Sequence, residues 1–191
     1  NKTLVYWNDA MQSTTCPSPT AGASIPDSEL IEAALMGEEW GYEVLTRRYQ
    51  DRLFTSIRHE VGCSVVAEDI VQDAFVRAFM HLRSFRSQSN FYTWLYRIAL
   101  NARRTYFRKR HRSLSLDVLG EGTEQMWSEL RESPSNCAER VEERKKVREA
   151  MTRLDEHHRT ILILREFEGF DYQKIADVLD VKVGTVRSRL S

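Results

Sequence analysis

Four polar residues recur at helical spacing near the middle of the chain: Arg97, Asn101, Arg104 and Arg108. Steps of four, three and four residues place them on one helix face, opposite an apolar side that carries Trp94. Guanidinium groups bind phosphate strongly, so this face is suited to the backbone of a nucleic acid. The pattern predicts a nucleic-acid-binding helix.

Neighbouring residues extend this pattern in two ways. More basic residues widen the charged stripe: Arg103, Lys109, Arg110 and Arg112. Aromatic residues interleave with it: Phe91, Tyr92, Tyr96, Tyr106 and Phe107. An unstacked base that lies on such a ring gains about 1–3 kcal/mol, so the mixture indicates single-stranded or partly melted nucleic acid. The alternative is a solvated Arg-rich helix whose aromatic side chains pack the core.

The last twenty residues have the proportions of a helix-turn-helix. Two short helices are predicted, 172–179 and 183–190, separated by a three-residue turn. Apolar residues would hold them together: Ile175, Ala176, Leu179, Val183, Val186 and Leu190. Outward-facing residues would meet base edges and phosphates in the major groove: Lys182, Thr185, Arg187, Ser188 and Arg189. The alternative is an ordinary helical hairpin.

Signatures of enzymes and metal sites are weak. The segment from His59 through Glu60 to Cys63 resembles H-E-x-x-H, but Cys63 replaces the second histidine that would bind zinc. The pair His157 and His158 follows two acidic residues at an expected helix start, where solvated histidines are common. No phosphate-binding glycine loop is present. We therefore expect no enzymatic activity, no cofactor and no metal.

Charge is distributed unevenly along a chain of zero net charge. Residues 27–82 hold 11 acidic and 5 basic residues, whereas residues 83–112 hold 9 basic residues and no acidic one. Residues 113–150 are acidic again, and residues 151–191 carry 7 charges of each sign. Because a local field binds phosphate whatever the total charge, the basic stretch predicts a polyanionic partner.

The elements that must position these residues are helices. The clearest apolar stripe, which predicts a core-facing helix, is Ile70, Val71, Ala74, Phe75, Ala78, Phe79 and Leu82. Two helices are expected before it, the first capped by Asp27, and a further helix runs to about Arg110. No period-two strand is evident. We predict an all-α protein with a flexible arm at 1–26, a helical domain at 27–112, a flexible linker at 113–137 and a second helical domain at 138–191.

Composition excludes other classes of protein. The 191 residues contain 41% hydrophobic and 29% charged residues, and no apolar run approaches the length that crosses a bilayer. The three cysteines form no C-x-x-C pair, which favours reduced thiols. We expect a cytoplasmic protein that is not itself a membrane protein.

Several segments resemble bacterial sigma factors of the extracytoplasmic-function (group IV) type. The segment 67–75, AEDIVQDAF, is similar to the family's D-x-x-Q-[DE]-x-F helix, and 90–101, NFYTWLYRIALN, is similar to its F-x-x-W-L-x-x-I-A-x-N helix. In the second domain, 154–159, 168–176 and 184–190 resemble the family's carboxy-terminal helix-turn-helix. The resemblance covers about residues 27–112 and 138–191.

This resemblance implies an alternative sigma factor with a sigma region 2-like and a region 4-like domain. Such a protein binds core RNA polymerase, melts and reads the minus-ten promoter element with the first domain, and reads the minus-thirty-five element as duplex with the second. It also implies a role in stress response and an anti-sigma factor that holds the protein inactive, in some members at the inner face of the membrane.

The resemblance also assigns residues. Polymerase binding would involve Asp69, Gln72, Asp73 and Phe75. Contacts to the minus-ten element would come from Phe85, Ser87, Asn90, Tyr92, Arg97, Asn101, Arg104 and Arg108. Contacts to the minus-thirty-five element would come from Lys182, Thr185, Arg187, Ser188 and Arg189. Asp180 and Lys182 depart from the family, which often has Gly at the turn and Ser as the cap of the recognition helix.

One alternative function fits part of the sequence. A helix-turn-helix regulator could act alone on duplex DNA, with the first domain as a helical sensor. A sensor would not need both an acidic helix and an aromatic, basic one. Those two helices therefore favour the sigma factor.

Overall fold

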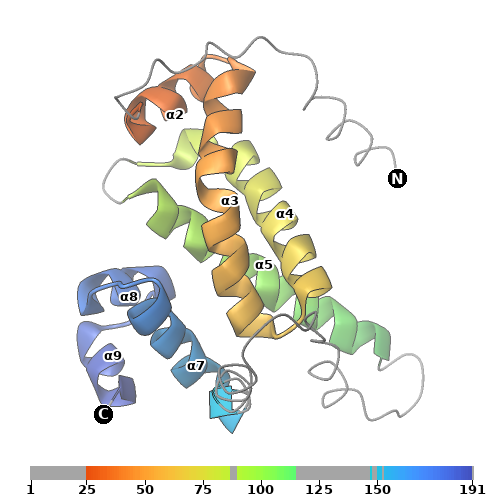
Figure 1. The fold of residues 1–191 in the computed structure, drawn as a ribbon, viewed down its shortest axis with the longest axis vertical. Helices are drawn as coiled ribbons and strands as arrows, with labels where there is room; N and C mark the ends of the chain where they lie inside the picture. The colour runs from red at the N-terminus through yellow and green to blue at the C-terminus, as the bar shows by residue number, and fades with distance from the viewer. Residues whose placement is uncertain (1–24, 87–89, 115–146, 148–149, 152, 191) are drawn as a thin grey trace, which may run out of the picture. The chain divides into compact units, whose positions relative to one another are not determined.

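The computed structural model describes residues 25–86, 90–114, 147, 150, 151 and 153–190. Its elements, drawn in Figure 1, are α2 (Asp27–Leu35), α3 (Glu39–Val61), α4 (Ser64–Met80), the 3₁₀ helix η1 (Leu82–Ser84), α5 (Phe91–Leu114), α7 (Glu156–Leu162), the π-helix η3 (Ile163–Phe167), α8 (Tyr172–Leu179) and α9 (Val183–Leu190). This part of the chain contains no β-strand. The predicted all-α class is confirmed.

The chain divides into two compact units, and the boundary between them falls within the sequence of α3, after Leu45. In the first unit, Gly41 allows α3 to approach α2 closely. A Cβ atom at Gly41 would lie 2.5 Å from the backbone oxygen of Leu30 and 2.9 Å from the nitrogen of Ala34. Only a residue without a side chain fits this crossing.

The second unit has a core between α4, α5 and the part of α3 that follows Leu45. Helices α4 and α5 pack side by side, with Ile70 and Ala74 of α4 and Leu95 and Ala99 of α5 almost fully buried. Helix α3 crosses α5 (Figure 1), and the hydroxyl groups of Ser56 and Tyr96 form a buried hydrogen bond of 2.8 Å between them. The long helices thus form a rigid support for the exposed face of α5.

The segment from α7 to η3 changes helical pitch. Asp155 caps α7, because its side chain accepts a hydrogen bond of 2.9 Å from the backbone nitrogen of His157. After Leu162 the hydrogen bonds widen, and the nitrogen of Glu168 donates to the oxygen of Ile163, five residues earlier. Gly169 then ends the helix with φ +66°, a left-handed backbone conformation that glycine adopts without steric cost.

Helices α8 and α9 have the bounds predicted for the helix-turn-helix. Asp171 caps α8 by accepting a hydrogen bond from the nitrogen of Lys174. Ile175, Ala176 and Val186 are buried between the helices, as expected. Asp180 occupies the turn in the left-handed region (φ 57°), where a glycine is common, so its side chain is tolerated at a conformational cost.

Some predicted boundaries shift. Helix α5 continues to Leu114, four residues beyond the predicted end near Arg110, and Asp27 is the first helical residue of α2 and not its cap, a position held by Pro26. The arm at 1–26 and the linker at 113–137 lie almost entirely outside the described residues. Within the described part, none of the helices is both long enough and apolar enough to cross a membrane.

Candidate protein and nucleic-acid interfaces

Helix α4 presents the residues that the sequence assigned to polymerase binding in two different environments. Asp69 and Gln72 are exposed on its outer face. Asp73 is half-buried and pairs with Arg77, with atoms of the two side chains 2.8 Å apart. Phe75 is only 4% exposed and packs into the core. Asp69 and Gln72 can therefore meet a partner directly, whereas Phe75 holds the helix in place.

Sequence reasoning missed an apolar surface on the same helix. Phe79, which the apolar stripe placed in the core, is 55% exposed. Val65, Val76 and Met80 are also exposed on α4. Apolar side chains that line an exposed face beside acidic ones are typical of a protein-binding surface. We call Val65, Asp69, Gln72, Val76, Phe79 and Met80 the α4 surface.

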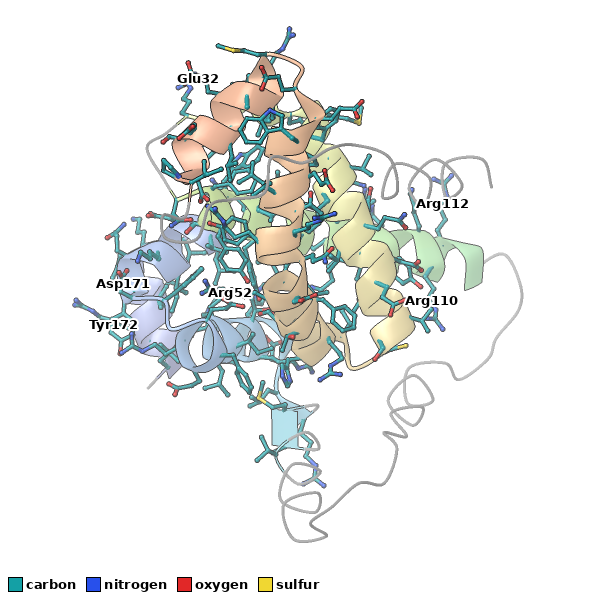
Figure 2. All side chains as sticks on the ribbon, turned by 45° about the horizontal axis from the view of Figure 1, so that its top comes forward. Glu32, Arg52, Arg110, Arg112, Asp171 and Tyr172 are labelled. Atoms are coloured by element: carbon teal, nitrogen blue, oxygen red, sulfur yellow. The ribbon has the colours of Figure 1, made fainter. Side chains whose placement is uncertain are left out.

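Helix α5 carries the predicted polar face. Arg97, Asn101, Arg104 and Arg108 are all exposed, as their spacing predicted. Arg104 donates a hydrogen bond of 3.3 Å to the side-chain oxygen of Asn101, which orients both groups outward. Figure 2 shows Arg110 and Arg112 on the same helix toward its far end. The described residues thus include a continuous basic face along one rigid helix.

The prediction that Arg103 widens this stripe is wrong. Arg103 is 5% exposed and turns inward, where its guanidinium lies 3.3 Å from the Glu60 carboxylate and also contacts Glu156. A buried acidic residue in α3 attracts the arginine because an unpaired charge in the interior is costly. Glu60 is also the acidic residue of the segment that resembles a zinc motif, and its carboxylate pairs with Arg103. In the described part of the chain, no three acidic, histidine or cysteine residues form a group that could hold a metal ion.

The predicted stacking surface is also largely wrong for this conformation. Phe91, Tyr92 and Tyr96 are at most 3% exposed, so bases cannot lie on their rings. Their apolar area is more stable inside the core, as the alternative interpretation held. Trp94, expected in the core, is half-buried.

A hydrogen bond to a buried carboxylate compensates for the burial of the Tyr92 hydroxyl group. Its hydroxyl donates a hydrogen bond of 2.9 Å to Glu168, and its ring lies 4.2 Å from the guanidinium carbon of Arg52. Burial and the neighbouring Glu168 carboxylate raise the pKa of Tyr92 far above its usual range, so the hydroxyl keeps its proton and remains a donor.

The loop before α5 contains the remaining residues assigned to the minus-ten element. Phe85 is half-buried, with its ring centre 5.2 Å from that of Trp94. The side chain of exposed Asn90 accepts a hydrogen bond of 2.8 Å from the nitrogen of Tyr92 and so caps α5, a role that sequence reasoning missed. Ser87 lies outside the described residues.

The predicted recognition helix α9 has its polar residues outward. Lys182, Arg187 and Ser188 are exposed, and Thr185 and Arg189 are half-buried. The Ser188 hydroxyl donates to the backbone oxygen of Thr185, 3.1 Å away. This distribution gives α9 the donors and positive charge that a major-groove helix needs.

Comparisons with known proteins agree with this arrangement. Residues 45–113 match the sigma-70 region 2 family, and residues 144–191 match sigma-70 region 4. The chain is 37% identical over 169 residues to the RNA polymerase sigma-H factor of Pseudomonas aeruginosa, which covers 86% of this chain and 88% of the relative. It is 35% identical over 171 residues to the ECF RNA polymerase sigma-E factor of Escherichia coli K12, covering 87% and 89% of the two chains.

Two solved structures share the fold. CnrH, in its complex with the cytosolic domain of CnrY, aligns with a TM-score of 0.62 at 26% identity and covers 86% of this chain and 89% of its own. The sigma factor RpoE of Bartonella quintana, in complex with the anti-sigma factor NepR, aligns with the same TM-score at 24% identity, over 78% and 89% of the chains. On its sequence relatives, its two family matches and its fold, the chain belongs to the extracytoplasmic-function group of RNA polymerase sigma factors.

Proposed function

We propose that the protein binds core RNA polymerase and directs it to promoters with two recognition elements, and that it is not itself an enzyme. One observation carries this proposal. Helices α4 and α5 pack against each other and carry exposed surfaces of different chemistry. The α4 surface is apolar and acidic, and the exposed face of α5 is basic. The first suits a protein partner and the second suits DNA.

In this proposal each surface has its own task. The α4 surface binds polymerase through Asp69 and Gln72, with Phe75 and the ion-paired Asp73 holding the helix. The basic face of α5, together with the loop from Phe85 to Asn90, binds the melted minus-ten element. Helix α9 reads the minus-thirty-five element. Separate surfaces allow one chain to bind polymerase and DNA together.

We also propose that an anti-sigma factor binds the protein and holds it inactive. It is supported by CnrH, whose solved structure contains the cytosolic domain of CnrY. We place the protein in the cytoplasm, with the anti-sigma factor able to hold it at the inner face of the membrane.

A transcription experiment tests the proposal. The purified chain is mixed with bacterial core RNA polymerase and a library of random promoter sequences, and the transcripts are sequenced. We expect start sites downstream of one shared two-part motif. DNA binding without polymerase and no motif-dependent transcript would instead indicate a stand-alone regulator.

A further inference from the structure

A small cavity lies among α5, α7 and the helix-turn-helix, and it has a volume of about 90 Å³. Its walls are partly apolar, with Leu100 from α5, Leu179 from α8 and Val181 from the turn that follows. A water molecule takes about 30 Å³ in the liquid, so this space holds about three waters or one tetrahedral oxyanion. The cavity therefore suits a single small polar group.

The polar part of the lining is positively charged. Arg103 and Arg104 of α5 and Arg189 of α9 line the cavity together with one acidic residue, Glu156 of α7. Three arginines and one glutamate give the lining a net charge of +2 when His157 is neutral. Like charges that are held close together repel one another, and an anion between them removes this cost. The charge of the cavity therefore favours an anionic ligand.

Arg103 is fixed in position by the protein itself. Its side chain is 6% exposed, and its guanidinium lies 3.3 Å from the Glu60 carboxylate and contacts Glu156. In the part of the chain that the structure describes, the Nε atom of Arg103 has no hydrogen-bond partner. A buried N–H group without an acceptor is costly, so an anion that accepts from it after a small turn of the side chain gains free energy.

Arg104 and Arg189 supply further donors. A guanidinium group has five N–H donors, and Arg104 uses one of them for the side-chain oxygen of Asn101, 3.3 Å away. Neither Arg104 nor Arg189 pairs with an acidic residue of the described chain. Because the two arginines come from different helices, they can bind different oxygens of one ligand.

Phosphate is the anion that matches these donors. A guanidinium group binds two phosphate oxygens side by side, and the tetrahedral group has further oxygens for a second and a third arginine. A carboxylate has only two oxygens, both in one plane. We propose that this cavity binds the phosphate group of a small ligand, either inorganic phosphate or a phosphate monoester. Arg104 and Arg189 are also assigned to promoter contacts, so the proposal is tested without DNA.

Isothermal titration calorimetry tests the proposal. The full chain is titrated at fixed ionic strength with inorganic phosphate, with glycerol phosphate or with acetate. We expect one phosphate group to bind per chain with a dissociation constant below about 1 mM, and acetate to bind at least about tenfold more weakly. Binding of inorganic phosphate alone, of the monoester alone or of both supports the proposal and identifies the source of the phosphate. No saturable binding of either, or equally tight binding of acetate, would overturn it.

A pair of variants locates the site. The cavity variant is Arg104→Gln with Arg189→Gln, and the matched control is Arg108→Gln with Arg187→Gln, which removes the same charge from the same two helices at exposed positions outside the cavity lining. We expect the cavity variant to bind phosphate at least about tenfold more weakly than the wild type, and the control to match the wild type. Equal affinities of the two variants would mean that phosphate is attracted loosely to basic helices, and would overturn the proposal.

Two further measurements keep the test decisive. Should the cavity variant prove unfolded by circular dichroism, Arg104→Gln is compared with Arg108→Gln, both at exposed positions of α5, and is judged by the same outcomes. In nuclear magnetic resonance spectra of the isotope-labelled full chain, the Nε–H signal of Arg103 should shift when phosphate is added. Phosphate binding that leaves this signal unchanged would place the ligand outside the cavity and contradict the proposal.

Discussion

Tyr92 donates its hydroxyl hydrogen to Glu168, which lies 76 residues farther along the chain. A residue assigned to promoter contact is thereby used, in this conformation, to hold the chain to itself. Removal of that hydroxyl should weaken this internal contact and leave the aromatic ring in place. In Tyr92→Phe the ring still packs against Phe170 and Tyr96, but Glu168 loses one of its donors.

The α4 surface should be required for polymerase and not for DNA. Asp69→Ala with Gln72→Ala removes two exposed polar groups, so we expect binding to core polymerase to weaken by about 1–2 kcal/mol, with duplex affinity unchanged. Glu29→Ala with Gln173→Ala, both exposed elsewhere, is the control. Both affinities can be measured by fluorescence anisotropy. Loss of duplex binding in the α4 variant would contradict the division of tasks.

Arg187 should contact duplex DNA from α9. Replacement of Arg187 by Ala should cost about 1–3 kcal/mol if the guanidinium contacts a base, or reduce the salt dependence of binding by about one unit if it contacts only phosphate. The measurement is duplex affinity at several salt concentrations, with Arg153→Ala as an exposed control. Unchanged affinity and unchanged salt slope would rule out α9 as the recognition helix.

The left-handed turn at Asp180 should be relieved by glycine. Asp180→Gly removes the steric cost of φ 57°, and the ion pair that it loses with Arg97 is exposed and weak. We expect the free energy of unfolding to rise by up to about 1 kcal/mol in urea titrations. Asp177→Gly, within α8, should instead lower it by about 1 kcal/mol. A lower stability for Asp180→Gly would show that the aspartate makes a favourable contact.

Gly41 should not accept a side chain. The Cβ of Gly41→Ala would meet backbone atoms of α2, which cannot move aside as a flexible side chain can, so we expect a loss of about 1–3 kcal/mol in unfolding free energy. Gly184→Ala is the control, because its Cβ would meet open space within α9 and should be neutral or stabilising. Equal stability of the two variants would mean that α2 shifts freely.

Glu60 predicts a specific pH dependence. Burial raises the pKa of its carboxyl above the ordinary 4.5, although Arg103 and Thr160 oppose this effect, as does Arg159, and Glu156 adds to it. The folded state therefore binds the proton more tightly than the unfolded state. Glu60 should thus contribute most to stability at low pH, and its contribution should decline as the pH rises from 4.5 through the folded-state pKa.

The difference between wild type and Glu60→Gln isolates this effect. Urea unfolding of both proteins between pH 4 and pH 8 should give a difference in unfolding free energy that falls as the pH rises in that window. A difference that rises with pH would mean that attraction by Arg103 outweighs the cost of burial.

The sequence predicted the helices well because their signals are local. The bounds of α8 and α9, and the exposed face from Arg97 to Arg108, follow from periodicity within single helices. The burial of Arg103 and Tyr92 does not follow from periodicity. Each is decided by an acidic partner distant in sequence, Glu60 in one case and Glu168 in the other. No local pattern distinguishes an arginine that faces solvent from one that reaches a buried carboxylate.

Phe79 illustrates the opposite error. Its spacing matched the apolar stripe of α4, yet the stripe is wider than the surface that α5 covers, so Phe79 is exposed. An unusually broad apolar stripe on a helix is itself a sign that a second partner binds there.

The π-helix η3 makes this segment sensitive to the deletion of a single residue. Its five-residue hydrogen bond accommodates one more residue than an α-helical turn would, and it sets the direction in which Glu168 leaves the helix. Deletion of one residue between Ile163 and Phe167 would restore ordinary helical pitch and rotate Glu168 by about 100° around the axis. The carboxylate would then point away from Arg52. A single codon deletion in this stretch should thus remove the contacts between Arg52 and Glu168 without changing any residue assigned to promoter contact.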